Sequence, residues 1–164
     1  MGEANLAQIE IGPARVPTAD LRGLIEELDR ELSANYAPEQ RHGLSLDAIF
    51  QPHIRFFMAR MNGTAVGCGG IALFADFAEL KRMYVRNEFR GQGVADAILA
   101  KLESEAREAG LTTARLETGT HQIAAIKFYQ RSGFQFCEAF EPYSSMPPEA
   151  ISTSVFLAKH LQRL

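Results

Sequence analysis

The sequence predicts an α/β (α+β) fold, with a mixed, mostly antiparallel sheet of about six or seven strands flanked by about four helices. Two features carry this prediction. Two apolar runs joined by Asn62-Gly63 are typical of an antiparallel hairpin, because Asn-Gly readily takes the positive φ angles of a tight turn. Residues 78–118 then change from strand to helical period and back, which indicates a parallel crossover.

The first third of the chain is expected to supply one strand and one long helix. Residues Gln8–Ile11 alternate weakly and end at Gly12-Pro13, which predicts a short first strand. Apolar residues recur at steps of three and four between Thr18 and Asn35, so an amphipathic helix is expected there. Residues 36–53 keep little period, and we expect only a short second helix set in loops.

Three strands and a helix follow in the middle of the chain. Strands are expected over Ile54–Met61, Ala65–Phe74 and Ala78–Val85. An apolar stripe with helical spacing then begins near Gly93 and ends at Gly110, a typical helix stop.

The last third should contain three more strands and one more helix. Ala114–Thr118 is short enough to be the second strand of the crossover. Ile123–Arg131 is expected to be a helix, while Phe134–Phe140 and Ser152–Ala158 are expected to be strands. The prolines between those two strands argue against regular structure there.

Length and charge restrict the function classes. The 164 residues suffice for a single domain over residues 1–164 without metals or disulfides. A net charge of -3 argues against nucleic acid as a partner, because such binding needs a basic surface. No apolar run is long enough to span a membrane and no secretory signal pattern is present, so we expect a cytoplasmic protein that does not bind membranes.

The cysteines and histidines predict no metal site. Cys68 and Cys137 are far apart and lie in apolar stretches, so both are expected to be buried, reduced thiols. The four histidines are scattered, and no pair has the spacing of a helical metal site.

The loop between the strand ending at Val85 and the following helix has the composition of an anion site. Gly91 and Gly93 would let backbone amides approach a diphosphate, and the first helical turn adds free N–H groups. Alternatively, the glycines only permit a tight turn. The third glycine of a dinucleotide fingerprint is missing, so an oxidoreductase or a nucleotide hydrolase is disfavoured.

Three motifs in a fixed order along the chain indicate a more specific function for this loop. Arg90-x-x-Gly93-x-Ala95 follows the strand Ala78–Val85, and Gln122-x-x-Ala125-x-x-Phe128-Tyr129 is followed by Gly133-Phe134. Together they resemble the signatures of the GNAT superfamily of N-acetyltransferases, and Leu116–Thr120 resembles a bacterial small-molecule subgroup. Gln122 stands where that family usually has asparagine, and Ala95 where it often has glycine.

The resemblance implies acetyl-CoA (coenzyme A) as co-substrate and no metal. It places the pantetheine arm along a strand and the pyrophosphate on the loop amides. The implied cofactor-binding residues are Met83, Tyr84, Val85, Arg90, Gly91, Gln92, Gly93, Val94, Ala95, Gln122 and Ala125.

Catalysis of this type needs a proton acceptor. An amine with a pKa near that of lysine is neutral in only about one molecule in 2,500 at pH 7, which is a handicap of roughly 4.6 kcal/mol. By resemblance Glu79 is the expected general base; Glu117 is the alternative, and Glu79 could instead pair with Lys81. Tyr129 stands where the family has its general acid, unless its ring only packs and its hydroxyl bonds to the backbone.

The expected activity is acetyl transfer from acetyl-CoA to the amine of a small molecule or amino acid, by direct attack in a ternary complex. Alternatives are a protein or peptide N-acetyltransferase and a non-catalytic acyl-CoA sensor. A homodimer is compatible with the family. Weaker candidates for acceptor contacts are Tyr36, His42, Glu117 and Tyr143.

Overall fold

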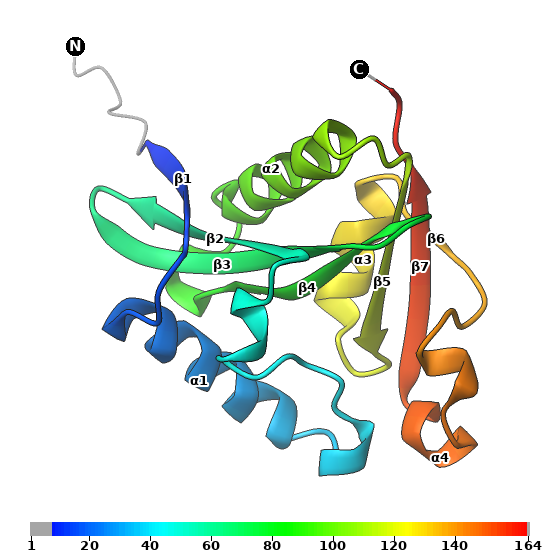
Figure 1. Cartoon of the computed structure of the whole chain (residues 1–164). Coiled ribbons are helices and arrows are strands. Elements are labelled where there is room, and N and C mark those ends of the chain that lie inside the picture. Colours follow the sequence, from blue (N-terminus) through cyan, green and yellow to red (C-terminus); the bar gives the residue numbers. More distant parts are fainter. Residues whose placement is uncertain (1–7, 164) are drawn as a thin grey trace.

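The computed structural model describes residues 8–163. One seven-stranded sheet runs in the order β1-β2-β3-β4-β5-β7-β6 (Figure 1). Its neighbours are antiparallel except β4 and β5, which are parallel. The strands are β1 (Ile9–Pro13), β2 (Ile54–Met61), β3 (Thr64–Leu73), β4 (Ala78–Val85), β5 (Thr113–Gly119), β6 (Gln135–Phe136) and β7 (Ser154–His160).

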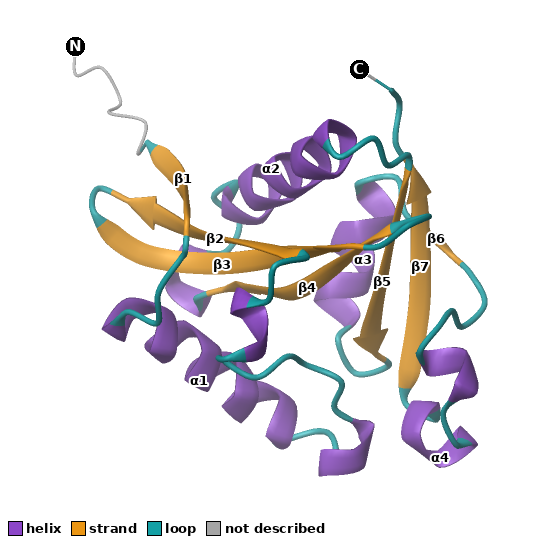
Figure 2. Ribbon diagram, in the orientation of Figure 1, coloured by secondary structure: helices purple, strands orange, loops and turns teal. Residues whose placement is uncertain are grey.

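Helices cover both faces of the sheet (Figure 2). Those of the described residues are α1 (Ala19–Ser33), α2 (Val94–Glu108), α3 (Ile123–Arg131) and the single-turn α4 (Pro148–Ile151). The predicted mixed, mostly antiparallel sheet with four helices is therefore confirmed, including the parallel crossover. None of the helices within residues 8–163 is long and apolar enough to cross a bilayer.

Each long helix buries one apolar face. Leu21 and Leu24 of α1 pack in one core cluster with Phe56, while Ile98 and Leu102 of α2 pack in a second cluster on the other face. α1 begins as predicted, because the hydroxyl of Thr18 accepts a hydrogen bond from the backbone N–H of Leu21 at 3.3 Å.

The β2–β3 hairpin forms at the predicted pair. Asn62 and Gly63 have φ angles of 51° and 83°, the conformation that favours Asn-Gly in a two-residue turn. The hairpin lengthens the antiparallel half of the sheet and supplies β3, the neighbour of β4.

Three predicted elements differ from the structure. Residues 36–53 hold two short 3-10 turns, Pro38–Gln40 and Ala48–Phe50, rather than a short α-helix. The strand expected over Phe134–Phe140 shrinks to β6, because the Phe134 N–H bonds to the Tyr129 carbonyl and closes α3. The proline-rich segment does contain regular structure, namely a 3-10 turn at Tyr143–Ser145 and the single turn α4, where Pro148 occupies the first position and its missing N–H is harmless.

The two cysteines differ in environment. Cys68 is buried in β3, as predicted, but Cys137 is exposed. Cys137 follows the short β6 strand at the edge of the sheet and its N–H bonds to the Phe156 carbonyl, so the side chain lies outside the core. The prediction that Cys137 is buried was wrong.

Candidate active site

The site begins where β4 and β5 separate. The two strands pair only at Ala78 with Ala114 and at Glu79 with Arg115, near the start of each. Beyond these pairs the parallel ladder ends, although β4 continues to Val85 and β5 to Gly119. Backbone groups of β4 after Glu79 are therefore not paired with β5, and a ligand can bond to them.

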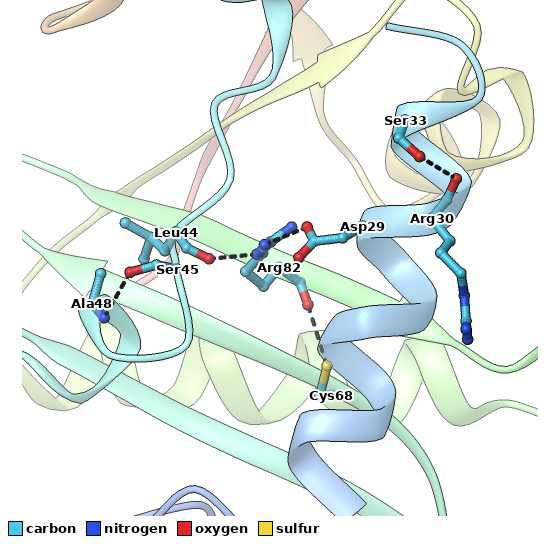
Figure 3. Close-up of polar contacts among 8 residues, drawn as sticks. All are labelled: Asp29, Arg30, Ser33, Leu44, Ser45, Ala48, Cys68 and Arg82. Carbon is cyan, nitrogen blue, oxygen red and sulfur yellow. Dashed lines mark hydrogen bonds and ion pairs between the residues drawn. The ribbon is translucent and has the colours of Figure 1, made fainter. Parts of the chain in front are cut away.

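A bulge in β4 accompanies this separation. Between the pairs Cys68–Tyr84 and Gly70–Lys81, two residues of β4 face one residue of β3. Arg82 in this bulge has a φ of 56°, which is uncommon for a residue with a side chain. Its guanidinium is held by Asp29 at 2.6 Å and by the Leu44 carbonyl at 2.8 Å (Figure 3). These contacts stabilise the strained residue and tie β4 to α1.

A cavity of about 550 Å³ opens beside the bulge. It is lined by every residue predicted to bind the cofactor except Gln92, whose side-chain amide donates to the Glu88 carbonyl instead. The lining therefore brings together three stretches that the motifs marked separately: the end of β4, the Gly-containing loop with the start of α2, and the start of α3.

The loop before α2 has the geometry of an anion cradle. Gly91 and Gly93 have φ angles of 77° and 86°, and Gly93 caps α2 without a side-chain hydrogen bond. The first amides of α2 thus remain available, at the positive end of the helix dipole. The Arg90 side chain is engaged by the protein, since it donates to the Val85 carbonyl at 2.9 Å and lies 3.4 Å from Glu31.

A second, smaller cavity of about 130 Å³ adjoins the first. Leu28, Met83, Gln122 and Ala125 line both cavities, so the two meet at the gap between β4 and β5. The smaller one is also lined by all the residues that the sequence suggested for catalysis or acceptor contacts apart from Tyr129, namely Tyr36, His42, Glu79, Glu117 and Tyr143.

Glu79 lies in a closed polar cluster. Its side chain is almost fully buried, and its Oε2 atom accepts a hydrogen bond from the Tyr143 hydroxyl at 2.5 Å. The Lys81 ammonium lies 3.0 Å from the same oxygen and 2.7 Å from the Tyr143 hydroxyl. The negative charge of Glu79 is therefore matched inside the protein.

Glu117 has a different environment on the neighbouring strand. Its Oε2 atom accepts a hydrogen bond from Ser154 at 2.6 Å, and no ion pair joins Glu117 to a described lysine or arginine. Burial raises the pKa of Glu117, although Ser154, His42 and Lys81 oppose this rise. A carboxylate with a raised pKa accepts protons more readily near neutral pH than an ordinary one.

Tyr129 lies within α3 and packs its ring against Phe128 and Phe134. The described residues that line the larger cavity include Phe128 but not Tyr129. Burial raises the pKa of Tyr129 above its usual range, so the hydroxyl stays protonated at neutral pH.

The segment after α1 crosses over the smaller cavity. The Tyr36 hydroxyl accepts the His121 N–H at 2.9 Å and lies 3.4 Å from the Gln122 side-chain oxygen, to which it donates. Further along, His42 Nε2 donates to the Ala150 carbonyl at 2.7 Å. These contacts join residues 36–42 to the start of α3 and to α4, so this segment forms a fixed wall of the cavity.

Sequence patterns did not point to all of these residues. The pairing of Glu79 with Lys81 was one of the two interpretations of Glu79, and the two side chains lie on the same face of β4 because strand side chains repeat every two residues. Arg41 also lines the smaller cavity, but it lies in a segment without period or motif. Ser154 reaches Glu117 only because β5 and β7 pair in the sheet.

Comparisons with known proteins agree with this geometry. The model of the Acetyltransferase (GNAT) family matches residues 21–134. A curated relative, the IAA acetyltransferase of Azospirillum brasilense, is 42% identical over 140 residues, which are 84% of this chain and 88% of that protein.

Solved structures share the fold. A Klebsiella pneumoniae protein proposed to be an acyl-CoA N-acyltransferase superposes with a TM-score of 0.78 at 36% identity, covering 94% of this chain and 98% of the other. PaiA N-acetyltransferase from Thermoplasma acidophilum, in complex with coenzyme A, gives 0.70 at 20% identity, covering 93% and 99%. The motifs, the separated strands and these matches agree: the chain belongs to the GNAT family of acetyltransferases.

Proposed function

We propose that the protein transfers the acetyl group of acetyl-CoA to the amine of a small molecule or an amino acid, in a ternary complex. The observation that carries this proposal is the junction of the two cavities between β4 and β5. The larger cavity offers helix amides to a diphosphate, and the smaller one offers carboxylates to an amine. A thioester at the junction would lie within reach of both.

The chemical step needs no covalent enzyme intermediate. The amine nitrogen attacks the thioester carbonyl carbon, the C–N bond forms, and the C–S bond breaks to release the thiol. The amine loses a proton to a protein base, and the departing sulfur gains one. A backbone N–H of β4 near Met83 or Tyr84 would stabilise the negative charge that develops on the carbonyl oxygen.

Two carboxylates compete for the role of base. Glu79 is the residue favoured by resemblance, and it remains a prediction. The contacts support Glu117 more strongly, because Lys81 and Tyr143 already occupy Oε2 of Glu79 while burial raises the pKa of Glu117. In this assignment Glu79 is a positioning residue that holds Lys81 and Tyr143 in place.

Tyr129 is proposed as the proton donor to the departing sulfur. Its hydroxyl is protonated at neutral pH, but burial raises its pKa, so this hydroxyl gives up the proton less readily than an ordinary tyrosine does. The hydroxyl would have to reach the gap between β4 and β5 from within α3. Replacement by phenylalanine keeps the ring packing with Phe134 and removes only the proton.

The loop over the smaller cavity favours a small acceptor over a protein. Residues 36–42 are bonded to α3 and α4 across the cavity, whereas a protein substrate would need an open groove. The alternative of a non-catalytic acyl-CoA sensor has less support, because a sensor needs no buried carboxylate beside the junction.

The first test is binding followed by turnover. Acetyl-CoA should raise the melting temperature of the purified protein, whereas NADH should not, because only a ligand of the folded state stabilises it. Amines are then screened for release of free thiol. Glu117→Gln and Glu79→Gln are compared with Glu108→Gln, an exposed control on α2.

The outcomes separate the roles. Loss of activity at neutral pH in Glu117→Gln alone would assign the base to Glu117, and loss in Glu79→Gln alone would assign it to Glu79. Tyr129→Phe with an unchanged rate would remove Tyr129 from the mechanism. No melting shift with saturating acetyl-CoA would refute the proposed function.

A further inference from the structure

The charges in the smaller cavity are not all matched by the protein. Lys81 pairs with Glu79 and Arg82 pairs with Asp29, so these four groups balance one another. The lining has one further carboxyl group, that of Glu117, and one further guanidinium, that of Arg41, and both remain outside these pairs. One is acidic and the other is a permanent cation.

Arg41 is the more unusual of the two. Its Nε atom is shielded from solvent, yet it has no hydrogen-bond partner among the described residues. Leaving a buried donor of a charged group unpaired is costly, and such groups are rare in folded proteins. The two terminal nitrogens of the same guanidinium are not buried and bond to no described residue, and Arg41 lines the cavity, so these nitrogens can bind an anion that enters it.

The backbone around Arg41 is held on both sides. The Arg41 N–H bonds to the Pro38 carbonyl at 3.2 Å, which closes the first 3-10 turn. The next residue, His42, is anchored to the Ala150 carbonyl, and the preceding Gln40 reaches Ser152 at 3.5 Å. The guanidinium is thus carried by a preorganised loop, so binding an anion requires little ordering of the chain.

We propose that the acceptor is a small amino acid, whose carboxylate binds the Arg41 guanidinium and whose amine lies beside Glu117. This inference rests on the proposed function and adds the class of acceptor to it. A guanidinium and a carboxylate form paired, charge-assisted hydrogen bonds, while the Glu117 carboxylate, which lines the same cavity, suits an amine. The cavity of about 130 Å³ limits the acceptor to a small molecule.

The test compares acceptors that differ only in their carboxylate group. A panel of small amino acids, each with its carboxamide and with its decarboxylated amine, is assayed for thiol release at fixed acetyl-CoA. We expect kcat/KM for the acids to exceed that for the matched neutral compounds by about 10- to 100-fold.

Arg41→Gln should remove this preference. Its KM for the amino acid should rise by about 10- to 100-fold while its KM for acetyl-CoA and its activity on carboxamides stay unchanged. Arg41→Lys should recover part of the affinity, because it restores the charge without the planar fork. Arg30→Gln is the charge-matched control, since Arg30 is exposed and its side chain extends away from Arg82 (Figure 3).

A binding measurement keeps the inference separate from turnover. In the presence of coenzyme A, an accepted amino acid should raise the melting temperature of the parent protein and of Arg30→Gln, but not of Arg41→Gln. Equal use of acids and carboxamides, or an unchanged Arg41→Gln, would overturn the inference and leave acetyl transfer standing. Absence of thiol release with every amine would instead count against the proposed function.

Discussion

Gly119 at the end of β5 offers a sharp test of how Tyr36 packs at the smaller cavity. A Cβ atom on this residue would lie 2.7 Å from Cε1 of Tyr36, and closer still to Cζ and the hydroxyl oxygen. Tyr36 is only 7% exposed, so its ring has little room to move aside. Gly119→Ala should therefore displace the ring and break the contacts of its hydroxyl with His121 and Gln122.

The expected loss is the sum of these effects. Overpacking of a filled site costs about 1–3 kcal/mol, and each neutral hydrogen bond contributes about 1 kcal/mol. We expect Gly119→Ala to lower the free energy of unfolding by about 3–5 kcal/mol, and the melting temperature by roughly 6–20 °C for a chain of this size. The KM for the amine should rise as well, because the covering loop loses its attachment to α3.

Calorimetry on two reference variants tests whether a Cβ at residue 119 acts through the Tyr36 ring. Gly12→Ala is the matched control, since a Cβ on Gly12 meets no atom within 4 Å and should change stability by less than about 0.5 kcal/mol. In a Tyr36→Ala background, Gly119→Ala should add almost no further loss, because the ring is gone. If Gly119→Ala melts like Gly12→Ala, or if the two losses simply add, Tyr36 does not pack against residue 119 in this way.

Three further predictions concern Glu117, Arg82 and the cysteines. Burial raises the folded-state pKa of Glu117, so ionisation of this carboxyl destabilises the fold as the pH rises from about 4.3, the ordinary pKa, through the raised pKa. Glu117→Gln should therefore raise the melting temperature at pH 7 but not at pH 4, and a melting temperature below that of the parent at pH 7 would contradict this. In denaturant unfolding, Arg82→Gly should be more stable than Arg82→Ala by about 1 kcal/mol, because both variants lose the side chain but only glycine tolerates the φ of 56°. Equal stabilities of the two variants would argue against backbone strain in the bulge. An alkylating reagent should modify the exposed Cys137 before the buried Cys68, whose pKa is raised to about 12, and mass spectrometry can follow both reactions. Modification of both cysteines at the same rate would mean that the core opens and exposes Cys68.

The elements that the sequence predicted best have a strong local signal. The strand Ala78–Val85 and the helix Ile123–Arg131 have the predicted bounds, and the Asn62-Gly63 turn forms where expected. In each case the hydrophobic period or the turn chemistry is contained within a few neighbouring residues. Tertiary contacts reinforce these segments and do not change them.

The elements that were missed depend on contacts with distant residues. Phe134–Phe140 has the composition of a strand, but only Gln135 and Phe136 pair with β7 in the sheet, Cys137 adds a single hydrogen bond to Phe156, and the chain then turns away into the segment that carries Tyr143. Residues 36–53 have no period, and their structure depends on docking: residues 36–42 bond to the start of α3 and to α4, while Ile49 packs with Leu24 and Phe56. Local propensity cannot predict such docking.

The two cavities differ in how far apart in the sequence their lining residues lie, and this difference affects substrate specificity. The larger cavity is built mainly from residues 83–96 and 121–131, two contiguous stretches with recognisable motifs. The smaller cavity combines residues from α1, the following loop, β4, β5 and the segment around Tyr143, which is 64 residues from its partner Glu79. Substitutions in the loop at Arg41 or His42 can therefore alter the acceptor without changing the cofactor half or the sheet. Relatives that keep the motifs at Arg90–Ala95 but differ at residues 36–43 should share the acetyl donor and differ in the amine, which a thiol-release screen of loop exchanges can measure.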